Sequence, residues 1–400
     1  MASHIMPTYG RLEITFDRGE GAWLWDENGK QYLDALSGIA VCGLGHAHPA
    51  VHEAICKQSG KLLHTSNIYR IAVQEQLADW LIDLSGMTNV FFCNSGAEAN
   101  EAAIKIARKY GHERGIDKPA IIVADKSFHG RTLATLSATG NPKIQKGFEP
   151  LVEGFIRVPY DNMAAITDAI RQHPNIVAIL VEPIQGEGGI NIPASDYLSN
   201  IRKACDQHNL LMMLDEIQSG MGRTGKFLAY QHNGILPDVC TLAKALGNGV
   251  PIGACLASGK AATVLTAGNH GSTFGGNPLA CSAALAVLET LDKDSLIATA
   301  ETKGEAICSG LAGLLRNNPH IVEIRHKGLM IGIELDAPCT ELVKMALVNG
   351  LLINVTQEKV IRLLPPLIID DSQIKLLVDT LGMLIMQFTG QFSPVSDHAA

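Results

Sequence analysis

Two charged residues follow apolar segments that have the length and composition of buried β-strands. Lys244 follows Val239–Ala243, and Asp215 follows Leu210–Leu214. Neither residue type is usually buried without a partner, because removing a charge from water is costly. A desolvated lysine has a lowered pKa and can form a Schiff base with an aldehyde. The aspartate can pair with a protonated heterocycle nitrogen or, alternatively, cap the next segment of the chain.

A turn of small residues, Asn94-Ser95-Gly96-Ala97-Glu98, separates a predicted strand from a predicted helix. Ser95 and Glu98 have the spacing of a capping box, with Ser95 as the N-cap. The free N–H groups and the positive dipole end of such a helix can bind phosphate. An ordinary strand–helix turn has the same sequence pattern, so this motif alone leaves both interpretations open.

Two further loops carry side chains that suit ligand contacts. Phe128 could stack on a planar ring, and Arg131 could bind a carboxylate through two hydrogen bonds. Packed aromatics and a solvated arginine would explain the same residues. Ser272 and Thr273 lie in a glycine-rich loop, where their hydroxyls suit phosphate or carboxylate contacts, unless the loop is only a domain linker.

Glu187 stands among glycines, in Gly186-Glu187-Gly188-Gly189, shortly after another apolar segment. Open α/β sheets bind ligands at the carboxyl ends of their strands. We expect the glycines to leave room for a side chain that moves and to give its backbone freedom. A glycine-rich connection with a solvated acid is the alternative.

Together these features describe a site for pyridoxal 5′-phosphate. A buried lysine would hold the cofactor covalently, an acid at a neighbouring strand end would meet the ring nitrogen, an aromatic would stack, and the turns would bind phosphate. His46 and His48 form an HxH pair, but without a third ligand nearby we expect no metal site.

The elements that must position these residues alternate between apolar strands and amphipathic helices. Uniformly apolar strands are typical of a sheet covered on both faces, so the pattern predicts an α/β domain with a mostly parallel sheet and helices on both faces. The expected strands are 90–93, 120–124, 155–158, 176–181, 210–214, 239–242 and 253–257, and the helices between them 98–110, 162–172 and 194–208.

The pattern changes near residue 276, where helices at 278–291 and 297–316 precede short strands and a last helix at 371–388. We therefore expect a large domain over residues 51–275 and a smaller α+β domain over 276–400. Residues 1–50 contain a predicted hairpin turn, Asp26 to Lys30, and we expect them to pack with the small domain.

Composition excludes several classes of protein. The 400 residues carry 32 Lys and Arg against 40 Asp and Glu, a formal net charge of −8, which argues against binding nucleic acid or anionic membranes. No apolar stretch reaches the roughly 18 residues of a membrane span. Nine scattered cysteines and no signal peptide lead us to expect a soluble, cytoplasmic protein. Residues 1–5 resemble a cloning scar before Met6.

The chain resembles the class III aminotransferases of the fold-type-I pyridoxal-phosphate family from about Gly21 to Leu384. The motifs that carry the resemblance are Gly45-His46-Ala47-His48-Pro49, Asn94 to Ala99, Phe128 to Arg131, Glu182 to Gly189, Asp215 to Gln218, Gly222 to Gly225, Leu242 to Ala245, Ser272 to Pro278 and Arg362 to Leu367. Within the family, residues 222–232 and 249–254 favour members that act on acetylated ornithine.

The resemblance implies a role for each motif at the cofactor. Lys244 would carry the cofactor and move the proton at the substrate carbon, and Asp215 would pair with the pyridine nitrogen. The other cofactor contacts would come from Ser95, Gly96, Ala97, Phe128, Glu216, Ile217, Gln218 and, from a second subunit of a homodimer, Thr273.

The resemblance also implies how substrates are held. Arg131, with Ser272, would bind the α-carboxylate of N2-acetylornithine. Arg362 would bind the α-carboxylate of 2-oxoglutarate, with Glu187 as its movable counter-ion.

The implied reaction moves the terminal amino group of N2-acetylornithine to 2-oxoglutarate, giving N-acetylglutamate 5-semialdehyde and glutamate in arginine biosynthesis. Succinylornithine, ornithine or 4-aminobutyrate as donors, or an aminomutase reaction, are the alternatives. A non-catalytic relative should have lost Lys244 or Asp215, and both are present.

Overall fold

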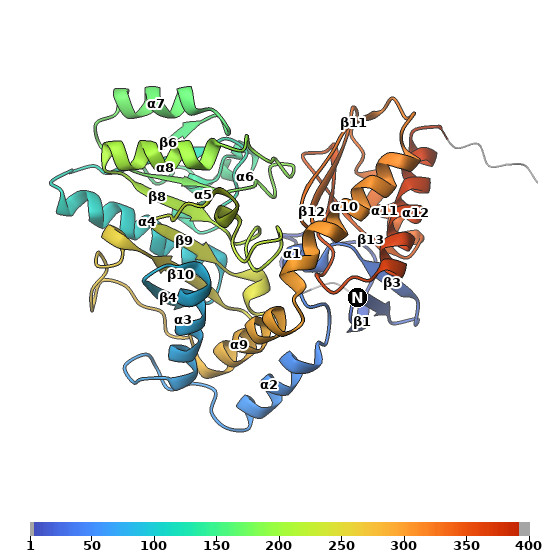
Figure 1. The fold of residues 1–400 in the computed structure, drawn as a ribbon, viewed down its shortest axis with the longest axis horizontal. Helices are drawn as coiled ribbons and strands as arrows, with labels where there is room; N and C mark the ends of the chain where they lie inside the picture. The colour runs from blue at the N-terminus through green and yellow to red at the C-terminus, as the bar shows by residue number, and fades with distance from the viewer. Residues whose placement is uncertain (1–3, 392–400) are drawn as a thin grey trace, which may run out of the picture.

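The computed structural model describes residues 4–391 and places them in two bodies (Figure 1). The residues of the suspected cloning scar lie partly outside this range. The larger body contains a seven-stranded sheet, and the smaller one contains two four-stranded sheets. Within the described range, none of the helices combines the length and apolar character that crossing a bilayer requires.

The large sheet confirms the predicted α/β architecture. Its strand order is β4-β10-β9-β8-β7-β5-β6, and only β10 runs antiparallel to its neighbours. The strands are β4 (Asn89–Cys93), β5 (Ala120–Ala124), β6 (Phe155–Val158), β7 (Ile176–Val181), β8 (Leu211–Asp215), β9 (Val239–Leu242) and β10 (Gly253–Ala257).

Both faces of this sheet are covered, which explains why its strands are apolar throughout. Alternate residues of each strand point to opposite faces. Val123 and Met213 pack in the core beneath α4 (Gly96–Glu113), whereas Ile122 and Met212 pack in the core that includes α7 (Met163–Gln172) and α8 (Tyr197–His208).

The smaller body is built on an antiparallel sheet in the order β11-β12-β15-β14. Its strands are β11 (Ile321–Lys327), β12 (Met330–Leu335), β14 (Asn354–Thr356) and β15 (Val360–Leu363). The helices packed around it are α10 (Leu296–Leu314), α11 (Glu341–Val348) and α12 (Asp371–Phe388). The tail after residue 391, expected to be loose, lies outside the described residues.

The N-terminal strands form the third sheet. β1 (Phe16–Glu20), β2 (Trp23–Asp26) and β3 (Gln31–Asp34) are antiparallel, and the Asp26 carboxylate accepts hydrogen bonds from the N–H groups of Asn28 and Lys30 in the predicted turn. β3 also pairs in parallel with β13 (Leu351–Leu352), which lies between α11 and β14 in the chain. The division of the chain at residues 50 and 275 stays a proposal.

Two helices that the sequence did not predict, α2 (Pro49–Ser59) and α3 (Ala72–Ser85), both pack on α9 (Pro278–Lys293). α9 therefore contacts the segment that precedes the large sheet as well as continuing into the smaller body through α10. The remaining short elements are α1 (Ser37–Ala40), α5 (Leu133–Ala138), α6 (Pro142–Gln145) and the 3₁₀ helices η1 (Ala229–Asn233), η2 (Lys244–Leu246) and η3 (Gly259–Ala261).

Candidate active site

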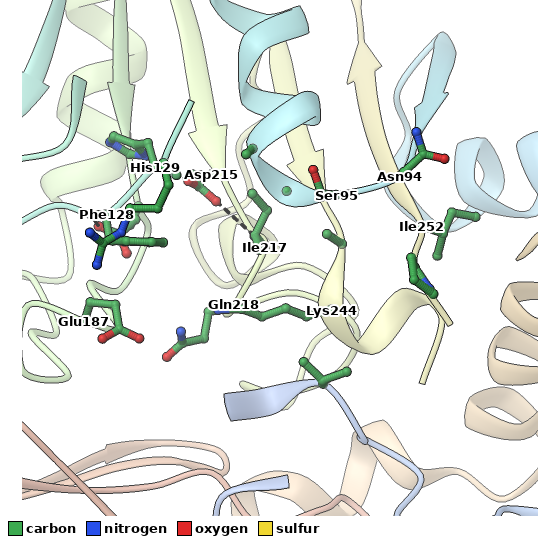
Figure 2. Close-up of a pocket in the computed structure, with 18 of the residues that line it drawn as sticks. Asn94, Ser95, Phe128, His129, Glu187, Asp215, Ile217, Gln218, Lys244 and Ile252 are labelled. Carbon is green, nitrogen blue, oxygen red and sulfur yellow. Dashed lines mark hydrogen bonds and ion pairs between the residues drawn. The ribbon is translucent and has the colours of Figure 1, made fainter. Parts of the chain in front are cut away.

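A pocket of about 400 Å³ lies at the carboxyl ends of β5, β7, β8 and β9. In the view of Figure 2, Asp215, His129 and Ser95 lie along its upper side, and Glu187, Gln218 and Lys244 along its lower side. Of the predicted site residues, ten line the pocket: Ser95, Gly96, Ala97, Phe128, Arg131, Glu187, Asp215, Ile217, Gln218 and Lys244.

Lys244 begins the 3₁₀ helix η2, two residues after β9 ends. Its φ of 44° is in the left-handed region, which a non-glycine residue rarely adopts. Burial lowers the pKa of Lys244 from 10.5 to about 8, and the nearby carboxylate of Glu187 opposes this shift. About a tenth of the amine is therefore neutral, and hence nucleophilic, at pH 7, far more than for an ordinary lysine.

Asp215 is the last residue of β8 and is only 4% exposed. Its Oδ2 accepts hydrogen bonds from His129 Nδ1 and Asn100 Nδ2, both at 2.8 Å, and its Oδ1 accepts one from Ile217 N at 3.1 Å. These donors compensate the loss of solvation and orient the carboxylate, so Asp215 is held by an extensive network rather than serving only as a cap.

His129 and Asn100 are functional candidates that the sequence analysis did not select. Asn100 also accepts a hydrogen bond from Thr241 Oγ1 on β9, so it links the strand of Asp215 to the strand that leads to Lys244. An asparagine on the apolar face of a helix, next to Ala99 and Ala103, is the signal that could have identified it.

The turn after β4 has the geometry of an anion site. Ser95 is the N-cap of α4, and its Oγ accepts from Glu98 N as predicted. No described residue accepts from the N–H groups of Gly96 and Ala97, which line the pocket. A Cβ at Gly96 would lie 2.7 Å from Ile217 Cδ1, so a larger residue there would displace the Ile217 side chain. Two free N–H groups at the start of an 18-residue helix suit a phosphate.

Phe128 and Arg131 lie on the opposite wall. The Arg131 guanidinium carbon is 5.7 Å from the centre of the Phe128 ring. Phe128 N donates to the carboxylate of Glu182, a buried residue whose pKa is raised by desolvation and by the charge of Asp215. Glu182 also accepts from Gly186 N, so it connects the Phe128 loop to the loop that carries Glu187.

Arg362 comes from β15 of the smaller body and reaches this pocket through Glu187. Its Nη1 lies 2.6 Å from Glu187 Oε1 and 3.4 Å from Gln218 Oε1. Arg362 is 1% exposed, whereas the side chain of Glu187 is 35% exposed. The structure thus brings together the arginine and its predicted counter-ion.

The glycines around Glu187 do not leave its backbone free. Thr356 Oγ1 and Gln357 Nε2 donate to the carbonyl of Glu187, and Arg325 donates to the carbonyls of Gly189 and Ile190. A Cβ at Gly186 would lie 2.2 Å from Gln218 Oε1. A side chain at position 186 would therefore displace the amide of Gln218, and the bonds to the Glu187 carbonyl leave its side chain as the part that is free to turn.

Besides Arg362, three predicted residues lie outside the pocket lining. Glu216 is buried behind Asp215, where its carboxylate accepts from Ser219 Oγ and Tyr230 N, and burial raises its pKa to about 7. Ser272 Oγ accepts from Asn94 Nδ2, a pocket residue, at 3.1 Å. Thr273 is exposed in the single chain. Nε2 of His46, a member of the HxH pair, lies 2.8 Å from Asp34 Oδ2.

The fold and this site define a class of protein. Residues 5–385 match the model of the class III aminotransferases, and the chain belongs to that family of pyridoxal-phosphate-dependent enzymes. It is 56% identical over 386 residues to the acetylornithine aminotransferase of Nitrosomonas europaea, covering 96% of this chain and 98% of that protein. Identity to acetylornithine aminotransferase 1 of Bordetella bronchiseptica is 51% over 391 residues, covering 98% and 100% of the two chains.

Solved structures agree with this assignment. The ornithine aminotransferase of Toxoplasma gondii superimposes with a TM-score of 0.94 at 35% identity, over 97% of this chain and 94% of that one. The acetylornithine aminotransferase of Elizabethkingia anophelis gives 0.86 at 36% identity, over 96% and 97%. The family, fold class and cofactor predicted from the sequence are thereby confirmed.

The described residues fit pyridoxal phosphate. The unbonded N–H groups of Gly96 and Ala97 would hold its phosphate, the Asp215 carboxylate would hold a proton on the ring nitrogen, and Lys244 would supply the amine. Once bound, the cofactor acts as an electron sink for the carbon that loses its proton. Lys244 would move that proton, and its lowered pKa suits transfer near neutral pH.

The lowered pKa of Lys244 predicts how cofactor capture by the cofactor-free chain depends on pH. Only the neutral amine attacks an aldehyde, so the capture rate should rise about tenfold per pH unit and level off near pH 8, the pKa of Lys244. Stopped-flow absorbance measures this rate. A rate that rises steadily to pH 10 would mean that an ordinary lysine reacts. The Lys244→Ala variant should have no turnover. Reduction with borohydride should attach the cofactor to no lysine in this variant.

Replacing Asp215 by Asn should preserve cofactor binding and lower kcat by about 100-fold or more, because an amide cannot stabilise a protonated ring nitrogen. Steady-state kinetics and the absorbance of the bound cofactor measure the two effects. Asp125 is exposed and directly follows β5, so it provides a matched control. Asp125→Asn should leave kcat and the absorbance of the bound cofactor unchanged. Activity of Asp215→Asn within a few-fold of the wild type would show that Asp215 has only a structural role.

Proposed function

We propose that this chain transfers the terminal amino group of N2-acetylornithine to 2-oxoglutarate, giving N-acetylglutamate 5-semialdehyde and glutamate, a step of arginine biosynthesis. The Arg362–Glu187 pair carries the proposal, because it gives one pocket two charge states. When Glu187 is paired with Arg362, the pair presents no net charge to a donor that has a single carboxylate. When the pair is open, the guanidinium of Arg362 can bind the second carboxylate of 2-oxoglutarate. The similarity to acetylornithine aminotransferases over nearly the whole chain supports this choice of donor.

In this scheme two arginines bind different carboxylates of the substrates. Arg131, on the outer wall, would bind the α-carboxylate of acetylornithine and the distal carboxylate of 2-oxoglutarate. Arg362 would bind only the α-carboxylate of 2-oxoglutarate or glutamate, next to the reacting carbon. Ser272, held by Asn94 beside the pocket, would assist Arg131.

Single-turnover reactions of the holoenzyme with different amines test the donor. Acetylornithine should react with a higher kcat/KM than ornithine, 4-aminobutyrate or succinylornithine, as measured by the loss of the cofactor's absorbance. Glutamate should form when 2-oxoglutarate is added. A faster reaction with one of the other donors, or amine migration without glutamate formation, would overturn the proposal.

The charge-pair scheme predicts unequal effects of Glu187→Ala on the two half-reactions. Without Glu187, the charge of Arg362 is not neutralised when the donor binds. The half-reaction with acetylornithine should therefore slow about tenfold or more, and the half-reaction with glutamate should slow much less. Amino acids other than glutamate should also begin to react through their free α-amino groups. Glu358→Ala, which removes an exposed ion pair with Lys143, is the matched control. Equal losses in both half-reactions under stopped-flow conditions would rule out the scheme.

We also propose that two copies of the chain share each active site through Thr273. Loop 62–69 lies against loop 272–276, where Asn67 Nδ2 donates to the carbonyls of Ser272 and Gly275. These loops expose a patch of large apolar side chains beside Thr273, including Ile68 at 80% and Phe274 at 62% exposure. A second copy that covers this patch would bring its Thr273 to the phosphate turn of the first.

Disruption of the patch should therefore separate the subunits and abolish activity together. Ile68→Asp should sediment as a monomer, lose cofactor more readily and show little turnover. Val348→Asp changes a residue of similar exposure, 73%, on α11 and should remain an active dimer. A fully active monomer at the assay concentration would refute the shared site.

A further inference from the structure

Arg362 is held on two sides by side chains of different charge. Glu187 and Gln218 contact its Nη1, as described above. On the other edge of the guanidinium, Asn354 Oδ1 accepts from Nε at 3.1 Å and from Nη2 at 2.8 Å. Asn354 and Arg362 lie directly opposite each other in the β14–β15 pair, so the backbone register places the amide beside the guanidinium.

This arrangement determines which part of the guanidinium is available to a ligand. The five N–H donors of arginine lie in one plane. Asn354 occupies the Nε edge with one oxygen. When the Glu187 side chain turns away, the hydrogens at the Nη1–Nη2 end remain for a carboxylate, in the parallel geometry of a two-bond arginine–carboxylate pair.

The neutrality of Asn354 matters as much as its position. A carboxylate in its place would form the same two hydrogen bonds and would also cancel the charge of Arg362 permanently. Arg362 is 1% exposed, so solvent would screen such a pair little. The arginine would then attract a substrate carboxylate weakly whether or not Glu187 had moved.

We propose that Asn354 is a positioning residue for the second substrate: it orients Arg362 through a neutral acceptor, so that the charge of the guanidinium is controlled by Glu187 alone and is available to the α-carboxylate of 2-oxoglutarate. The inference rests on the proposed function and assigns to Asn354 a part in the choice between a substrate with one carboxylate and a substrate with two.

The test is Asn354→Asp in the holoenzyme, which changes charge and almost nothing in shape. The half-saturating concentration of glutamate in its half-reaction should rise about 10- to 100-fold, while that of acetylornithine should stay within about threefold. Titration calorimetry with glutarate, a five-carbon dicarboxylate that cannot react, should show a similar weakening of Kd. Asn28→Asp adds the same charge at an exposed hairpin and should change none of these values.

Asn354→Ala gives a second measurement that does not depend on the new charge. It removes the acceptor and leaves Arg362 less well oriented, so the Kd of glutarate should rise several-fold. Equal changes in both half-reactions, or an unchanged glutarate Kd in both variants, would overturn the role of Asn354. A wild-type enzyme that reacts with neither glutamate nor acetylornithine would instead refute the proposed function, and the wild-type reactions therefore distinguish the two failures.

Discussion

The register between β8 and β9 is the constraint on which the active site depends. In this parallel pair, Asp215 lies opposite Thr241, three residues before Lys244, and Glu216 N donates to the carbonyl of Thr241. A shift of one residue would turn Asp215 toward the other face of the sheet, because side chains alternate along a strand. The apolar cores on both faces fix this register. Asn100 bridges the two strands, bonding to Asp215 on one and Thr241 on the other.

In the proposed scheme, the smaller body supplies the part of the site that discriminates between substrates. Arg362 and Asn354 lie on its strands β15 and β14, and Arg325 of β11 holds the carbonyls that follow Glu187. In this scheme the large sheet holds the residues that would bind the cofactor, and the small sheet sets the charge that a substrate would meet. Relative movement of the two bodies would displace one part of the Glu187 loop against the other, since the loop leaves β7 of the large sheet and is bonded to Arg325 of the small sheet.

The parts of the structure that local physics determines were predictable from the sequence. Lys244 and Asp215 were identified because each follows a long apolar run, and burying a charged residue is costly unless a partner compensates it. The same apolar runs located the strands. α2 and α3 escaped prediction because their few buried residues pack against α9, more than 190 residues away in sequence. His129, Asn100 and Asn354 form hydrogen bonds to partners that only the tertiary structure brings near. The roles of Thr273 and the other individual site residues stay predictions until they are tested.

In the proposed scheme, the difference in exposure between Arg362 and Glu187 determines which partner of the pair would move. Arg362 has four hydrogen bonds to three residues and almost no contact with solvent, so turning it away would leave a buried cation without compensation. Glu187 is one-third exposed, and water can replace the arginine as its partner. Hydrogen bonds from Thr356 and Gln357 hold its backbone to the small sheet, so in this scheme the motion would be confined to side-chain torsions. A charge switch at this pocket would therefore require an immobile cation, a neutral residue to orient it, and a partly solvated acid, and in the proposed scheme these roles belong to Arg362, Asn354 and Glu187.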